Sequence, residues 1–262
     1  MSDEARHRGS IYLHRGDLVQ ALAWYRKAEA SDRAAHDPTA LTETLGNLGN
    51  VLAMSGAYDD AVGCYRELLV IQRERQDQLA IAQTLINLGN IKKEVHEVEA
   101  ARAYYLEALA MIQPLEEYRV LGALYANLGL LEANQGDGQK AIEHFHRALD
   151  CHRAVGDEDG LAMTYSQLGK TFLSLDQWLN AERCLNNASE HFIKLGNEPS
   201  EAAVLRVLAD LYERRADRMT ALRCLERVVQ IGLRYRLPHL ADDRARLAQL
   251  RGEHQAPPGA QV

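Results

Sequence analysis

Amide side chains recur along this sequence at one fixed spacing. The row consists of Asn47, Asn87, Asn127 and Gln167, with Asn50 and Asn90 beside it. An amide both donates and accepts hydrogen bonds, although Asn inside a helix costs about 0.5 kcal/mol relative to Ala. A row of amides can therefore pair with the backbone of an extended peptide without reading its side chains. The simpler interpretation is that Asn is merely a favoured residue at this place.

Residue patterns for catalysis are missing from the sequence. It holds no Gly-rich phosphate loop, no His-Glu-x-x-His and no Gly-x-Ser-x-Gly. His144 and His146 are two residues apart, so on a helix they point to different faces and cannot comfortably share a metal ion. The four cysteines form no Cys-x-x-Cys pair, which speaks against zinc. We therefore expect no enzyme, no metal site and no cofactor.

The charge balance is mildly acidic, since 30 Lys and Arg stand against 37 Asp and Glu for a net charge of −7. A general nucleic-acid binder needs a basic surface, so nucleic acid is not an expected partner. No apolar run approaches the ~20 residues that span a bilayer, and the first residues lack the apolar stretch of a secretory signal. With four unpaired cysteines, this predicts a cytoplasmic protein without membrane insertion.

A helical repeat is the element that positions the amides, because other landmarks share their spacing. Leu-Gly pairs stand at 48–49, 88–89, 128–129 and 168–169. An alanine follows at Ala61, Ala101, Ala141, Ala181 and Ala221. A ring or bulky side chain then comes at Tyr65, Tyr105, Phe145, Leu185 and Leu225. Counting backwards adds Gly9, Ala21 and Tyr25, so six repeats share one register.

The physics of one repeat predicts two antiparallel helices. Apolar and small residues within 45–52 recur at i, i+3, i+4 and i+7, which is one stripe of a helix. Gly49 and Ala61 are small enough to let two helices approach closely, and the ring of Tyr65 fills the space beside them. Gly56 supplies the positive φ that ends the first helix. Each repeat therefore reads as helix A, turn, helix B, turn.

These landmarks resemble those of the tetratricopeptide repeat family over residues 3 to 235. The usual repeat of that family has ~34 residues, and the longer form with the spacing found here resembles kinesin light chains, Pins-type spindle adaptors and many bacterial regulators. HEAT and armadillo repeats have a similar length of about 40 residues but lack the Leu-Gly pair and the Gly turn. The resemblance implies an all-α fold, a right-handed superhelical solenoid of six helix-turn-helix repeats closed by a C-terminal capping helix.

The register sets the expected boundaries along a single solenoid domain, residues 1–251. The six repeats cover about 2–37, 38–77, 78–117, 118–157, 158–197 and 198–237. Pro238 suits the first turn of a helix, so the capping helix is expected over 238–251. The remaining residues, 252–262, contain Pro-Pro-Gly and are expected to be disordered.

The resemblance further implies that the A helices line a concave groove, where related proteins clamp peptide backbone with Asn. The expected peptide-binding residues are Asn47, Asn50, Asn87, Asn90, Glu94, Asn127, Asn134, Gln167 and Lys170. The carboxylate clamp of chaperone-binding relatives needs Lys and Arg on successive A helices. Its basic places hold Gly46, Gln83, Ile86 and Ala123. An extended internal segment is therefore the better expected ligand.

The function that follows is a protein-interaction adaptor whose groove binds an extended peptide segment of a partner. The alternative is a scaffold that self-assembles as a homo-oligomer or joins a cytoskeletal filament through its convex face or ends. Tyr58, Trp24 and Trp178, if exposed, would serve such contacts. The alternative is packing between neighbouring B helices, which is the better expectation for Trp24. A third hypothesis is a sensor module of a larger system, although no signalling or DNA-binding domain is attached to this sequence.

Overall fold

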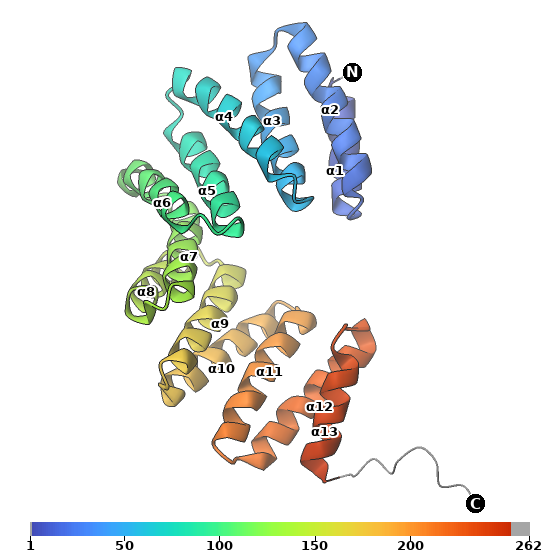
Figure 1. Cartoon of the computed structure of the whole chain (residues 1–262), viewed down its shortest axis with the longest axis vertical. Helices are drawn as coiled ribbons and strands as arrows, with labels where there is room; N and C mark the ends of the chain where they lie inside the picture. The colour runs from blue at the N-terminus through green and yellow to red at the C-terminus, as the bar shows by residue number, and fades with distance from the viewer. Residues whose placement is uncertain (1, 253–262) are drawn as a thin grey trace, which may run out of the picture. The chain divides into compact units, whose positions relative to one another are not determined.

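The computed structural model describes residues 2–252. In this range every regular element is a helix, and the elements form six successive pairs followed by α13 (Figure 1). The prediction of an all-α fold is confirmed. The expected disordered tail, 252–262, lies outside the described residues from residue 253 onward. Contacts between Cα atoms divide the chain into two compact units, Met1–Asn127 and Leu128–Val262.

Unit 1 contains the first three helix pairs. Its elements are α1 (Ser2–His14), α2 (Leu18–Ala35), α3 (Pro38–Met54), α4 (Tyr58–Glu74), α5 (Gln78–Glu94), α6 (Val98–Ile112) and the short 3-10 helix η1 (Gln113–Leu115). Each helix packs on the next one along the chain, from α1 on α2 to α5 on α6. The odd-numbered helices are the A helices of the repeats and the even-numbered ones are the B helices. The division between the units falls within α7 (Tyr118–Asn134).

Unit 2 contains the remaining helices. They are α8 (Gly138–Ala154), α9 (Glu158–Ser174), α10 (Trp178–Lys194), α11 (Glu198–Arg214), α12 (Arg218–Tyr235) and α13 (Leu240–Arg251). One hydrophobic cluster connects α8 to α13, from Ala141 to Leu247. That the two units form the single solenoid domain expected for residues 1–251 stays a prediction.

The close approach of helices A and B depends on the Leu-Gly pair. A Cβ built on Gly89 would lie 2.5 Å from Cε1 of Tyr105, and one built on Gly49 would lie 2.7 Å from Cε1 of Tyr65. Real Cβ atoms do not approach a ring this closely, so only glycine fits while the ring stays in place. The alanine that faces this contact, such as Ala61, is fully buried.

The turn between helices A and B has the same left-handed backbone in all six repeats, whichever residue stands there. Gly56 and Gly136 have φ of 81° and 82°. His96 and Ala216 occupy the corresponding places with φ of 62° and 57°. A side chain makes this conformation costly, so the packing of the helices, and not the residue type alone, fixes the turn.

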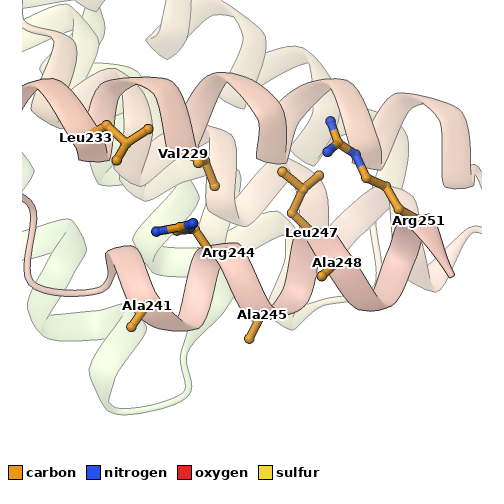
Figure 2. A pocket seen from close by; sticks show the side chains of 8 residues that line it. All are labelled: Val229, Leu233, Ala241, Arg244, Ala245, Leu247, Ala248 and Arg251. Carbon is orange, nitrogen blue, oxygen red and sulfur yellow. The ribbon is translucent and has the colours of Figure 1, made fainter. Parts of the chain in front are cut away.

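The last helix leaves a hollow of about 600 Å³ beside α12. It is lined by Val229 and Leu233 of α12 and by alanine, leucine and arginine side chains of α13 (Figure 2). In the repeat register Gln249 of α13 stands where Gly49 and Gly89 stand in earlier repeats. Gln249 is exposed, whereas Gly49 and Gly89 each lie against a tyrosine ring of their B helix.

Candidate peptide-binding site

Four of the nine expected groove residues lie around one hollow of unit 1. Asn50 on α3 and Asn87, Asn90 and Glu94 on α5 line a space of about 520 Å³. Its remaining walls are apolar or aromatic, and they include Leu13, Ala53, Met54, Tyr58, Tyr65 and Ile91. The repeat spacing and the 3.6-residue turn together place these amides side by side on neighbouring A helices.

Tyrosines of the B helices hold two of these amides in a fixed orientation. Tyr65 Oη donates to Asn50 Oδ1 at 2.6 Å, and Tyr105 Oη donates to Asn90 Oδ1 at 2.6 Å. Asn87 Nδ2 also lies 3.4 Å from Asn50 Oδ1. A carbonyl oxygen can only accept, so both hydroxyls must be donors. The Nδ2 groups of Asn50 and Asn90 have no hydrogen-bond acceptor within the described chain, so they remain available to a ligand.

Burial keeps both tyrosine hydroxyls protonated. It raises the pKa of Tyr65 and of Tyr105 well above the usual value of 10, because an ionised phenolate would lose its hydration inside the protein. The two rings are almost completely buried. Both tyrosines therefore act as permanent donors to their asparagines across the neutral pH range.

The sequence reasoning missed this pairing, although a signal for it was present. Tyrosine follows its Asn by 15 residues in both pairs. Tyr25 has Ser10 at the same separation, and the Ser10 side chain hydrogen-bonds to it. Phe145, which has no hydroxyl, has Leu130 at that place. In these four repeats, helix A therefore has a polar residue where the ring of helix B has a hydroxyl, and an apolar residue where it has none.

Tyr105→Phe tests the value of this hydrogen bond. The ring remains against Gly89, so only the hydroxyl is lost, and we expect the free energy of unfolding to fall by about 1 kcal/mol in urea titrations. Phe145→Tyr is the reverse experiment. It introduces a buried hydroxyl opposite Leu130 and should destabilise the protein by about 1–3 kcal/mol instead of stabilising it. Stabilisation by Phe145→Tyr would contradict the pairing rule.

The other expected groove residues lie elsewhere. Asn47 lines a second hollow of unit 1, of about 360 Å³, together with Glu43 and residues of α1. Asn127 is half-buried and Asn134 is exposed, both on α7. Gln167 is half-buried and Lys170 exposed on α9, in unit 2. The structure thus groups Asn50, Asn87, Asn90 and Glu94 around one hollow, and the peptide-binding role of all nine residues stays a prediction.

The three aromatic residues considered for outer contacts are not exposed. This corrects the expectation for Tyr58 and Trp178, whereas packing was already the preferred interpretation of Trp24. Tyr58, Trp24 and Trp178 are all half-buried. Tyr58 contributes to the hollow beside Asn50. Trp24 is covered by two cations, with Arg8 Cζ 4.7 Å and Lys27 Nζ 5.0 Å from its ring centroid. Tyr58 and Trp24 therefore make contacts within unit 1.

Metal clusters and reactive cysteines are two features that would indicate a reaction centre. No group of three or more His, Cys, Asp or Glu side chains in this range could hold a metal ion. Burial raises the pKa of Cys64 and of Cys184 to about 11, so both are neutral thiols at pH 7 and poor nucleophiles. None of the described helices is long and apolar enough to cross a membrane.

Comparison with known structures finds the same repeat fold in proteins of different size. BtubC from P. vanneervenii is 26% identical with a TM-score of 0.63, over 72% of this chain and 78% of BtubC. A signal transduction ATPase with a tetratricopeptide repeat sensor from Pyrococcus horikoshii is 16% identical with a TM-score of 0.80, over 95% of this chain and 38% of that protein. A putative kinesin light chain from Podospora anserina is 13% identical with a TM-score of 0.59, over 74% of this chain and 95% of that one.

Comparison with curated protein sequences finds no match. The family model for the tetratricopeptide repeat, in contrast, matches four stretches of this sequence: 4–74, 41–113, 119–178 and 160–233. These stretches cover most of the described chain, and together they extend from α1 to α12. The predicted resemblance is confirmed: the chain is a solenoid protein of the tetratricopeptide repeat family, a fold that serves as a scaffold for protein interactions.

Proposed function

We propose that this protein is a non-catalytic adaptor that holds an extended segment of a partner protein in the hollow between α3 and α5. The observation that carries the proposal is the pair of hydrogen bonds from Tyr65 to Asn50 and from Tyr105 to Asn90. Each leaves an amide Nδ2 as an oriented donor on the rim of one hollow. Donors held in place before binding lose less entropy when a ligand arrives, which favours affinity.

The chemistry of the hollow fits a backbone more than a single side chain. Two Nδ2 donors on successive A helices match carbonyl oxygens along an extended chain. Met54, whose side chain is 63% exposed, and Ile91 offer an apolar floor for one residue of the segment. Glu94 is more than half exposed, and its Oε1 lies 3.6 Å from Lys93 Nζ on the same helix. It gives the rim a negative charge that suits a basic residue of the ligand.

A photo-crosslinker placed at Met54 tests this site. Val70 on α4 is the matched control, because it is 57% exposed in the same unit but does not line the hollow. We expect the partner segment to crosslink at position 54 and not at position 70. The crosslink at 54 should disappear when Asn87→Ala and Asn90→Ala are introduced together. Crosslinking at position 70 alone would instead favour the scaffold hypothesis, and so would concentration-dependent sedimentation of the protein by itself.

The setting of this function is also a proposal. The four cysteines are free and none is paired in a disulfide, which suits a reducing compartment such as the cytoplasm. Protein, and not nucleic acid, is the proposed partner, because the net charge of −7 repels a polyanion.

A further inference from the structure

Neighbouring B helices of unit 1 are linked by an arginine and a glutamate that stand at one fixed separation in the sequence. Arg33 Nη1 and Nη2 of α2 donate to the two carboxylate oxygens of Glu67 on α4, both at 2.7 Å. Arg73 Nη2 of α4 donates to Glu107 Oε1 on α6 at 3.3 Å. The guanidinium lowers the pKa of Glu67, as expected for a carboxylate in such a pair. The same separation in the sequence identifies the corresponding pair of positions in unit 2.

In unit 2 the arginine of this pattern is kept and its carboxylate is missing. Arg153 of α8 has Asn187 of α10 at the separation that joins Arg33 to Glu67. The Arg153 guanidinium makes two other hydrogen bonds instead. Its Nη1 donates to Asp150 Oδ1 on the same helix at 2.9 Å, and its Nη2 donates to Tyr165 Oη on α9 at 2.7 Å. An amide cannot neutralise a guanidinium, so no carboxylate of α10 compensates Arg153 as Glu67 compensates Arg33.

A hollow of about 340 Å³ lies at this place, between α8 and α10 over α9. It is lined by Arg153, Arg183 and His146 and by no Asp or Glu, although the whole protein is acidic. Within the described chain the side chains of Arg183 and Asn187 have neither a hydrogen-bond nor an ion-pair partner. The floor is apolar, formed by side chains such as Leu149, Leu168 and Phe172.

We propose that this hollow binds a glutamate or aspartate side chain from an acidic segment of a partner protein, whose carboxylate takes the place that Glu67 and Glu107 occupy in unit 1. Arg153 supplies a planar guanidinium, which can bind a carboxylate through two parallel hydrogen bonds when it turns from Asp150, and such charge-assisted pairs are among the stronger hydrogen bonds. Arg183 and Asn187 supply further donors. The apolar floor accommodates the methylene groups of a glutamate and an aliphatic neighbour. This site uses B helices of unit 2, so it is separate from the proposed groove between α3 and α5.

The test uses the full chain with methyl-labelled leucines and two capped peptides, Gly-Leu-Glu-Leu-Glu-Gly and Gly-Leu-Gln-Leu-Gln-Gly. These differ only in their carboxylates. We expect the glutamate peptide to shift the methyl resonances of Leu149 and Leu168 in a saturable manner. The glutamine peptide should bind at least about tenfold more weakly. No shift at millimolar peptide, or equal binding of the two peptides, would overturn the proposal.

Asn187→Glu provides the matched variant, because it restores within the chain the pair that Arg33 makes with Glu67. We expect this variant to fold normally and to have a slightly higher melting temperature. Its affinity for the glutamate peptide should be at least about tenfold lower than that of the unchanged protein. Ile193→Glu adds the same charge to an exposed position of α10 outside the hollow and should leave affinity within about twofold. Equal weakening by both variants would mean that only the overall charge matters, and the site would be rejected.

Discussion

Gly89→Leu is expected to destabilise unit 1 by about 3 kcal/mol or more, because the Cβ alone would lie 2.5 Å from the ring of Tyr105. That ring is completely buried and also makes the hydrogen bond to Asn90, so it cannot move aside without losing both interactions. Helix propensity would act in the opposite direction, since Leu is favoured over Gly by about 0.8 kcal/mol. Urea or thermal denaturation of the full chain measures the difference.

The chain offers a matched control for this change. Gly63 lies in α4, is exposed, and has no neighbouring atom within 4 Å of a built Cβ. Gly63→Leu should therefore leave stability unchanged or raise it by several tenths of a kcal/mol. If the two variants had similar effects, the close approach of helices A and B would not depend on glycine.

Arg206→Ala is expected to detach the C-terminal helix α13 from α11. The free energy that holds α13 in place should fall by about 3–5 kcal/mol. Arg206 donates from Nε and Nη2 to both carboxylate oxygens of Asp243, at 2.9 to 3.0 Å. Asp243 is only 5% exposed, so removing the guanidinium leaves a buried charge without its partner. Hydrogen exchange of the amides of Leu247 and Ala248 would report the release.

Two comparisons sharpen this prediction. The double variant Arg206→Met/Asp243→Leu removes both charges together. It should restore most of the protection of the α13 amides against hydrogen exchange, because apolar residues of similar volume replace buried ion pairs well. Arg251→Ala breaks a pair with Glu226 in which the two side chains are 42% and 50% exposed, so it should cost less than about 1 kcal/mol. Equal losses in Arg206→Ala and Arg251→Ala would contradict the assigned role of the buried pair.

The helices and their order were predictable because the landmarks recur at one fixed spacing without insertion. Leu48-Gly49 and its repeats carry both the helical stripe and the close contact, so a periodic pattern alone specifies a helix pair. The A–B turn was less predictable, since His96 and Ala216 adopt the left-handed backbone that the sequence suggests only for glycine. There the packing of two helices overrides the preference of a single residue.

The candidate site was predictable in part. The fixed spacing of Asn50, Asn87 and Asn90 was sufficient to place these amides on one face of neighbouring A helices. The sequence could not show that Leu13 of α1 and Tyr58 of α4 close the same hollow, because that depends on how three helix pairs pack together. It also assigned Asn50 and Asn90 to the ligand alone, whereas each already accepts a hydrogen bond from a buried tyrosine.

The most direct test of the peptide-binding proposal is a double-mutant cycle between Asn90 and the backbone of the captured partner segment. Asn90→Ala removes the amide, and an amide-to-ester change at the bound residue weakens its carbonyl as an acceptor. If Asn90 Nδ2 holds that carbonyl, calorimetric affinities should give a coupling of about 0.5–1.5 kcal/mol. Additive effects, within about 0.3 kcal/mol at every ester position, would contradict recognition of the backbone by the amides.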